Sequence, residues 1–220
     1  NKQDNKVMRQ DLYRLVDGNI KAILSNEGYL DYKLFSTHGD MILSGVSGFA
    51  NEDNQVRLPL NIRTDLPTNT VYTSHPFMPS SSWQETHGQN YPTPTMLFIA
   101  PVHDWAGKTV AFFAFEIDPD KIFNPAFHEN QVGQTGQAYA IDEHGRMLTQ
   151  SKFTKQLIQA GLIDAAHPLS ELALEVRDPG VNLLSSEKKQ VAANAPLTLM
   201  AKSLTQHQTG VSLKGYRDYR

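Results

Sequence analysis

The chain has 220 residues, with 20 Lys and Arg against 23 Asp and Glu, so its formal net charge is −3. This balance argues against nucleic acid or an anionic membrane surface as the main partner, and an apolar content of 40% argues against wholesale disorder. The absence of cysteine excludes disulfides, thiolate metal ligands and a thiol nucleophile. The length suits one large domain or two small ones, and the most apolar stretches, residues 96–102 and 110–117, are too short to span a bilayer.

The first part of the chain predicts a helix followed by a hairpin. Apolar residues recur at three- and four-residue spacing over residues 1–25, at Met8, Leu12, Leu15, Val16, Ile20, Ile23 and Leu24. Gly28 then predicts the end of this helix. Residues 29–36 and 41–44 are rich in aromatic and branched side chains and flank Thr37-His38-Gly39-Asp40, which predicts a β-hairpin.

The middle of the chain is rich in proline. Residues 59–101 hold seven of the twelve prolines, so we expect loops with short elements there, and long loops in a compact domain are often binding loops. Residues 95–102 and 108–117 predict a second hairpin. Asp118-Pro119 then predicts the start of a short helix, with aspartate as the cap.

A second unit is predicted from Gly133 onward. Residues 138–141 and 146–149 predict a hairpin around the turn Asp142-Glu143-His144-Gly145. His144-Gly145 follows the similar pair His38-Gly39 by 106 residues. This offset predicts that the chain contains two copies of one sheet module, each of which opens with a similar hairpin. Residues 155–163 and 169–176 predict helical or semi-regular segments, 197–204 a further helix, and 216–220 a final strand. We expect the charge pairs Arg177-Asp178 and Arg217-Asp218 to form ion pairs with each other, which would hold the last strand against the preceding loop.

Several runs resemble a known family when they are taken in order. Residues 135–142 (TGQAYAID) and 145–153 (GRMLTQSKF) are similar to the opening of the membrane-proximal module in double Cache sensor domains, also called tandem PDC domains. The later runs RDPG, PLT and GYRDYR, at residues 177–180, 196–198 and 215–220, are similar to sensor regions of bacterial membrane histidine kinases. Residues 100–104 (APVHD), Gly107 and residues 113–118 resemble the strand-turn-strand that closes a membrane-distal module.

The resemblance implies an α+β fold, with a long N-terminal helix at residues 1–25 and two PAS-like antiparallel-sheet modules. It places the membrane-distal module at residues 26–127 and the membrane-proximal one at 131–220. The family pattern runs on past residue 220, so we expect the second sheet to be incomplete, with an open edge. The chain would then be an extracytoplasmic, periplasmic portion of an inner-membrane protein, lying between two transmembrane helices and relaying a signal to a cytoplasmic output, with a histidine kinase expected.

The candidate ligand site lies in the proline-rich stretch and its neighbouring strand. Aromatic faces with hydroxyl, amide and imidazole groups suit a small polar ligand, and we select Tyr72, Ser74, His75, Ser82, Trp83, Tyr91 and Phe98. Amino-acid-binding Cache members carry an Arg-x-Trp-Tyr run in this region. Here Ser81-Ser82-Trp83-Gln84 takes that place, so the bidentate carboxylate clamp of an arginine is missing and an amino-acid ligand is not supported.

Catalysis and metal binding have little support in the sequence. The eight histidines lack the paired spacing of a metalloprotease, and there is neither a nucleophile elbow nor a phosphate-binding loop. We therefore expect a protein that is not an enzyme and holds no cofactor or metal, with a homodimer through the N-terminal helix as a possible assembly. Two alternatives stay open: an enzyme that uses His75 or His87 as a base, and a structural extracellular module without a ligand.

Overall fold

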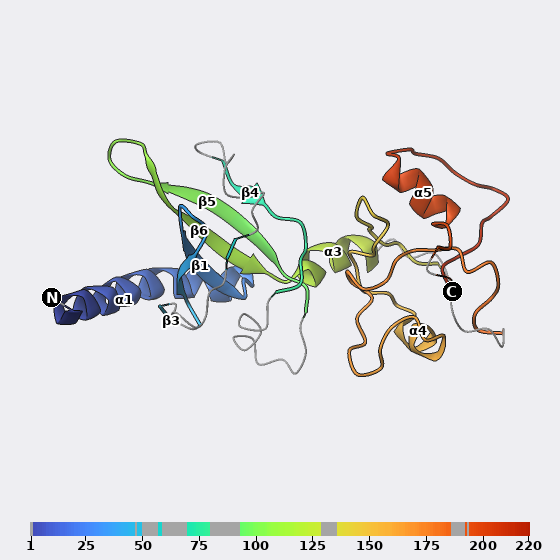
Figure 1. Ribbon diagram of the computed structural model, residues 1–220, viewed down its shortest axis with the longest axis horizontal. Coiled ribbons are helices and arrows are strands. Elements are labelled where there is room, and N and C mark those ends of the chain that lie inside the picture. The colour runs from blue at the N-terminus through green and yellow to red at the C-terminus, as the bar shows by residue number, and fades with distance from the viewer. Residues whose placement is uncertain are drawn as a thin grey trace. The chain divides into compact units, whose positions relative to one another are not determined.

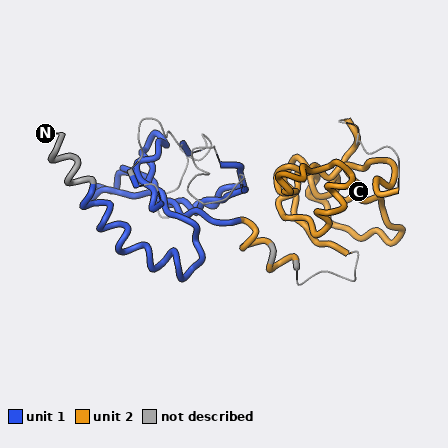
Figure 2. The backbone as a smooth tube through the Cα atoms, turned by 90° about the horizontal axis from the view of Figure 1, so that it is seen from below, with its two compact units in different colours: residues 1–118 blue, residues 119–220 orange. Residues whose placement is uncertain are grey.

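A computed structural model describes residues 2–46, 48–49, 57–58, 70–79, 93–128, 136–185, 192 and 194–220. The chain divides into two compact units, residues 1–118 and 119–220 (Figure 2). The division falls at the start of the helix after Asp118, whereas the sequence analysis assigns that helix to the distal module. The two units are described separately below.

Unit 1 opens with the predicted helix, α1, which spans Lys2–Glu27 (Figure 1). It ends where Gly28 adopts a positive φ of 73°, and the backbone N–H groups of Gly28 and Tyr29 both donate to the carbonyl of Leu24. The helix lies against the sheet, and the Tyr13 hydroxyl donates to the carbonyl of Gly45 at 2.9 Å. Among the described helices, none combines the length and the apolar character needed to cross a bilayer.

The sheet of unit 1 is antiparallel throughout and has six strands in the order β3-β2-β1-β6-β5-β4. These strands are β1 (Asp31–Ser36), β2 (Met41–Ser44), β3 (Gly48–Phe49), β4 (Tyr72–Thr73), β5 (Met96–His103) and β6 (Thr109–Ile117). Both predicted hairpins of this unit, β1–β2 and β5–β6, are confirmed. With α1, they confirm the predicted α+β class and the N-terminal helix.

The two faces of the sheet have different coverings. On one face the Tyr32 hydroxyl lies 3.5 Å from Asp17 of α1, and Tyr32 stacks on Phe113. The other face carries the apolar core of unit 1, formed by Phe35, Leu58, Leu97, Ile99, Phe112 and Ala114. Alternation along each strand separates the two sets, because successive side chains point to opposite faces.

Where the chain is described, one turn design occurs three times. The side-chain oxygen of its first residue accepts hydrogen bonds from the backbone N–H groups two and four residues later, and its fourth residue is a glycine with positive φ. The first residues are Ser36, Asp104 and Asp142. The first and third turns lie 106 residues apart, as the predicted repeat requires. Since the Asp104 turn is built in the same way, this agreement reflects common hairpin chemistry.

The described residues of unit 2 form three helices, α3 (Pro119–His128), α4 (Thr154–Gln159) and α5 (Leu199–Thr205). In its described part the predicted hairpin is reduced to the single bridge between Ile141 and Met147. Two further bridges join Arg146 to Glu175 and Arg177 to Leu197. The described backbone pairing thus consists of isolated bridges, and a PAS-like form for this unit stays a proposal.

The core of unit 2 includes a residue close to the end of the chain. Tyr219 is 1% exposed, packs edge-on against Tyr139, and its hydroxyl lies 2.8 Å from Gln137 Oε1 and 3.0 Å from Ser151 Oγ. Residues 216–220, predicted as a strand, are irregular. The predicted link between charge pairs is present, since Arg217 Nε lies 3.8 Å from Asp178 Oδ2.

Gly18 lies within α1, and a Cβ added there would have nothing within 4 Å. We expect Gly18→Ala to raise the free energy of unfolding by about 0.5–1 kcal/mol, because alanine loses less backbone entropy in a helix. Chemical denaturation measures this change. Gly28→Ala is the matched control: space is equally open there, but the positive φ disfavours alanine, so this variant should be destabilised. A Gly18→Ala protein less stable than the original would contradict the prediction.

Candidate functional site

The most unusual feature of unit 1 is a group of three charged side chains inside the sheet. Asp31 and Lys33 lie on β1, and Glu116 pairs with Asp31 from the neighbouring β6. Residues two apart on a strand share a face, so all three side chains meet on the face opposite α1. The Lys33 ammonium lies 2.7 Å from Asp31 Oδ2 and 2.8 Å from Glu116 Oε2, and none of the three side chains is more than 1% exposed. We call this group the ion cluster.

Hydroxyl and backbone groups hold the two carboxylates in place. Ser44 Oγ donates to Asp31 Oδ2 at 2.6 Å, and Thr95 Oγ1 donates to Glu116 Oε1 at 3.0 Å. The other oxygen of Asp31 accepts the backbone N–H groups of Tyr32 and Val46. These bonds come from separate strands and turns, so the carboxylates are fixed before any ligand arrives.

Gly45 allows the chain to pass close to the ion cluster. A Cβ at this position would lie 2.5 Å from Cε1 of Tyr32 and 2.7 Å from Oδ1 of Asp31, closer than carbon atoms can approach without displacement. The carbonyl of the same glycine accepts the Tyr13 hydroxyl. The turn after β2 is therefore packed between α1 and the first residues of β1.

The ion cluster is costly for a purely structural element. Among the described residues it holds two carboxylates and one ammonium, so it has a net negative charge when all three groups are ionised. Removing charges from water costs several kcal/mol per ion, and a buried ion pair is often no more stabilising than apolar residues of the same volume. What the cluster provides is a set of fixed, oriented polar groups beside the apolar core of unit 1, and a few oriented polar groups among apolar side chains are also a feature of small-molecule sites.

Two of the predicted site residues lie near this face. Tyr72, on β4, pairs with Ile99 of β5 and packs half-buried against the apolar core of unit 1. Ser74 is buried, accepts the backbone N–H of Leu97 through its hydroxyl and donates to the carbonyl of His75. Ser74 thus extends the pairing between β4 and β5.

Of the other predicted site residues the structure describes two, His75 and Phe98, and neither side chain joins those of Tyr72 and Ser74. His75 is exposed. Phe98 points to the α1 side of the sheet, where it meets Tyr29 edge-on at 6.4 Å. Ser82, Trp83, Tyr91 and the alternative base His87 lie outside the described residues. Asp31, Lys33 and Glu116 were not among the predicted site residues, although charged residues alternating with aromatic ones in a strand pattern were a usable signal.

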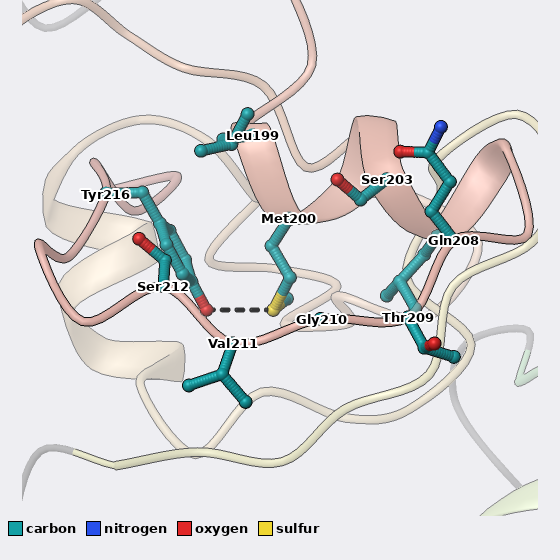
Figure 3. Close-up of a pocket in the computed structure, with 10 residues that line it drawn as sticks. Leu199, Met200, Ser203, Gln208, Thr209, Gly210, Val211, Ser212 and Tyr216 are labelled. Atoms are coloured by element: carbon teal, nitrogen blue, oxygen red, sulfur yellow. Dashed lines mark hydrogen bonds between the residues drawn. The ribbon is translucent and has the colours of Figure 1, made fainter.

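Unit 2 has a separate pocket of about 720 Å³ between α5 and the segment that follows it (Figure 3). The Tyr216 hydroxyl donates to Sδ of Met200 at 3.1 Å, and Leu199 and Val211 are exposed beside it. The lining is mostly apolar, with no charged side chain among its residues. This pocket can offer contact area and neutral hydrogen-bonding groups, whereas the ion cluster offers charge.

Within the described part of the chain, no group of three or more His, Asp and Glu side chains is arranged to hold a metal ion. Comparison of the sequence and structure with protein-family models, curated proteins and solved structures finds no match.

Proposed function

We propose that the chain is the extracytoplasmic sensor region of a transmembrane signalling protein, with a histidine kinase as the expected output. In this proposal residues 26–127 are a membrane-distal Cache module that binds a small polar molecule, and residues 131–220 are the membrane-proximal module. The supporting observation is the ion cluster, because three buried charges beside the apolar core of unit 1 are better explained by recognition than by stability. Since α1 covers the other face, the ligand would approach the face that carries the cluster and Tyr72.

Binding would act on the output through a difference in affinity between two states of the sensor. A ligand that binds one state tenfold more tightly shifts the balance by about 1.4 kcal/mol. The ion cluster suits this role because it connects β1 with β6, the two central strands. A ligand that exchanges bonds with either carboxylate would change how these strands are held together.

The test is a thermal-shift screen with amines, dicarboxylates, amino acids and sugars. A compound at 100 times its Kd should stabilise the protein by about 2.7 kcal/mol. We expect this shift to disappear in the triple variant Asp31→Asn, Lys33→Met, Glu116→Gln, which removes all three charges together and should remain folded. Lys21→Met, which removes an exposed ammonium on α1, is the control and should keep the shift.

Two outcomes would contradict the proposal. A shift of full size in the folded triple variant would show that the ion cluster takes no part in binding. A screen without any shift would favour the alternative of a structural module without a ligand. Turnover of a screened compound that is lost in His75→Ala would favour the enzymatic alternative instead.

A further inference from the structure

The pocket of unit 2 is formed by one continuous part of the chain, residues 199–216 (Figure 3). The helix α5 forms one side, and residues 206–216, which we call the returning segment, form the other. The reversal between them occurs at His207, which has a positive φ of 54°, and the backbone N–H groups there donate to carbonyls of α5. Beyond the pocket, Arg217 Nη1 donates to the carbonyl of Gly180 at 2.7 Å. Both ends of the returning segment are thus fixed, so the pocket is built into the fold of unit 2.

The pocket has apolar side chains that the core of unit 2 does not use. Whereas α5 contributes Ala201 to that core, Leu199 and Leu204 line the pocket and keep 57% and 42% of their surface in water. Exposed apolar side chains gathered around a cavity often mark a binding site. The volume of about 720 Å³ is also in the range of small-molecule pockets. The lining therefore suits the apolar part of a ligand.

The hydroxyl of Tyr216 has a poor hydrogen-bond acceptor inside this pocket. It donates to the thioether sulfur of Met200, and such a sulfur accepts hydrogen bonds only weakly. A carboxylate oxygen at the same place would be a much better acceptor, because hydrogen bonds to an ionised group are about twice as strong as neutral ones. Beside its apolar lining, the pocket thus offers one donor that an anionic group would use.

The part of the chain that forms the pocket is basic, although the whole chain has a net charge of −3. Residues 199–217 contain Lys202, Lys214 and Arg217 but no Asp or Glu. Arg217 lies near Asp178, which offsets its charge, and the two lysines are exposed. An excess of one sign of charge around a cavity raises the local concentration of ligands with the opposite sign. The surroundings of the pocket therefore favour an anion.

From these features we propose that the pocket binds a free amphiphile with one apolar chain and one anionic group, such as a fatty acid of medium length. The apolar chain lies against Leu199 and Leu204, and the carboxylate accepts the Tyr216 hydroxyl in place of the sulfur. Because the lining residues carry no charge, no buried ion opposes the apolar chain. This site lies within unit 2 and neither requires nor tests the sensor function proposed for the ion cluster.

Isothermal titration calorimetry of the whole chain with decanoate, below its micelle concentration, tests the proposal. We expect saturable binding of decanoate, at least about fivefold tighter than binding of decyltrimethylammonium, which has the same chain and the opposite charge. Leu204→Gln should weaken decanoate binding at least about tenfold, because it removes an apolar contact. Leu213→Gln is the matched control, since Leu213 is 96% exposed on the returning segment but does not line the pocket. Both variants change exposed side chains and should keep the melting curve of the original chain.

The anionic group has a separate test in Tyr216→Phe. This variant should weaken decanoate binding at least about threefold and leave the binding of decanol unchanged, because only the carboxylate uses the hydroxyl as a strong donor. Unchanged binding of decanoate in Tyr216→Phe would overturn the assigned position of the carboxylate. Decyltrimethylammonium that binds as tightly as decanoate would overturn the preference for an anion.

Three further outcomes would overturn the pocket as the site. One is the absence of saturable decanoate binding, and another is equal affinity of Leu204→Gln and Leu213→Gln for decanoate. The third is binding of the chain to phosphatidylglycerol vesicles without binding of monomeric decanoate. That result would assign the exposed apolar and basic side chains to contact with a lipid bilayer instead of a free amphiphile.

Discussion

Replacing Lys33 with methionine is expected to lower the free energy of unfolding of unit 1 by about 3–5 kcal/mol. The methionine fills a similar volume but removes the ammonium that lies between Asp31 and Glu116. Two buried carboxylates would then lose the ammonium that each of them contacts at 2.7–2.8 Å. Because a small domain is stable by only about 5–15 kcal/mol, this change removes a large part of its stability. Differential scanning calorimetry, with hydrogen exchange to assign each transition to its unit, measures the loss.

Two variants test whether the loss comes from unpaired charge. Lys21→Met removes the ammonium of an exposed ion pair with Asp17 and should change the free energy of unfolding by less than about 1 kcal/mol. The triple variant Asp31→Asn, Lys33→Met, Glu116→Gln should recover most of the stability lost in Lys33→Met. A triple variant as unstable as Lys33→Met would indicate that packing of the lysine stem, not charge, causes the effect.

Raising the pH from 10 to 12 is expected to destabilise unit 2 by about 2 kcal/mol through Tyr219 alone. Burial raises the pKa of Tyr219 from the ordinary 10.0 to about 12, while the hydrogen bond with Ser151 acts in the opposite direction. A tyrosine whose pKa rises on folding binds its proton more tightly in the folded state. Its contribution to stability is complete below pH 10 and is lost as the pH rises through 12. Urea denaturation at a series of alkaline pH values measures it.

Tyr219→Phe is the informative variant, because it keeps the ring against Tyr139 and removes the ionisable hydroxyl. Its stability should fall less steeply between pH 10 and 12, although burial also raises the pKa of Tyr139, so some alkaline loss remains. Tyr216→Phe changes a half-exposed tyrosine of the same unit and serves as the control. Identical pH slopes for the original chain and Tyr219→Phe would contradict the assignment.

Features set by neighbouring residues were predictable from the sequence. The turns at Gly39 and Gly107 were expected because glycine supplies the positive φ that their geometry needs. The helix α5 was predicted from its apolar spacing, and it begins at Leu199 because the Thr198 side chain accepts the backbone N–H of Ala201. In unit 2 the expected strands 138–141 and 146–149 share one bridge, since local turn chemistry does not decide how far a ladder extends.

The candidate site was harder to predict from the sequence. The ion cluster depends on pairing of β1 with β6, which belong to different predicted hairpins, and no local pattern states which hairpins become neighbours. Lys33 was predicted to lie in a strand, but the sequence did not show which face of the sheet it is on. That follows only from the position of Phe35 in the apolar core of unit 1, because residues two apart on a strand share a face. The predicted site instead grouped residues mainly by closeness in sequence. Tyr72 pairs with Ile99, and successive side chains along a strand point to opposite faces, so Tyr72 and Phe98 lie on opposite faces of the sheet.

The strand order of unit 1 also has a consequence for how this unit folds. The hairpins β1–β2 and β5–β6 each close over a short turn, but their junction, β1 against β6, brings together segments separated by the proline-rich stretch. Long-range pairing of this kind is the slow part of sheet formation, since the chain loses loop entropy before any contact compensates. The charges of Lys33 and Glu116 leave water at this same junction. The step that completes the sheet is therefore also the step that assembles the candidate site, so a chain with only its two hairpins formed has no ion cluster.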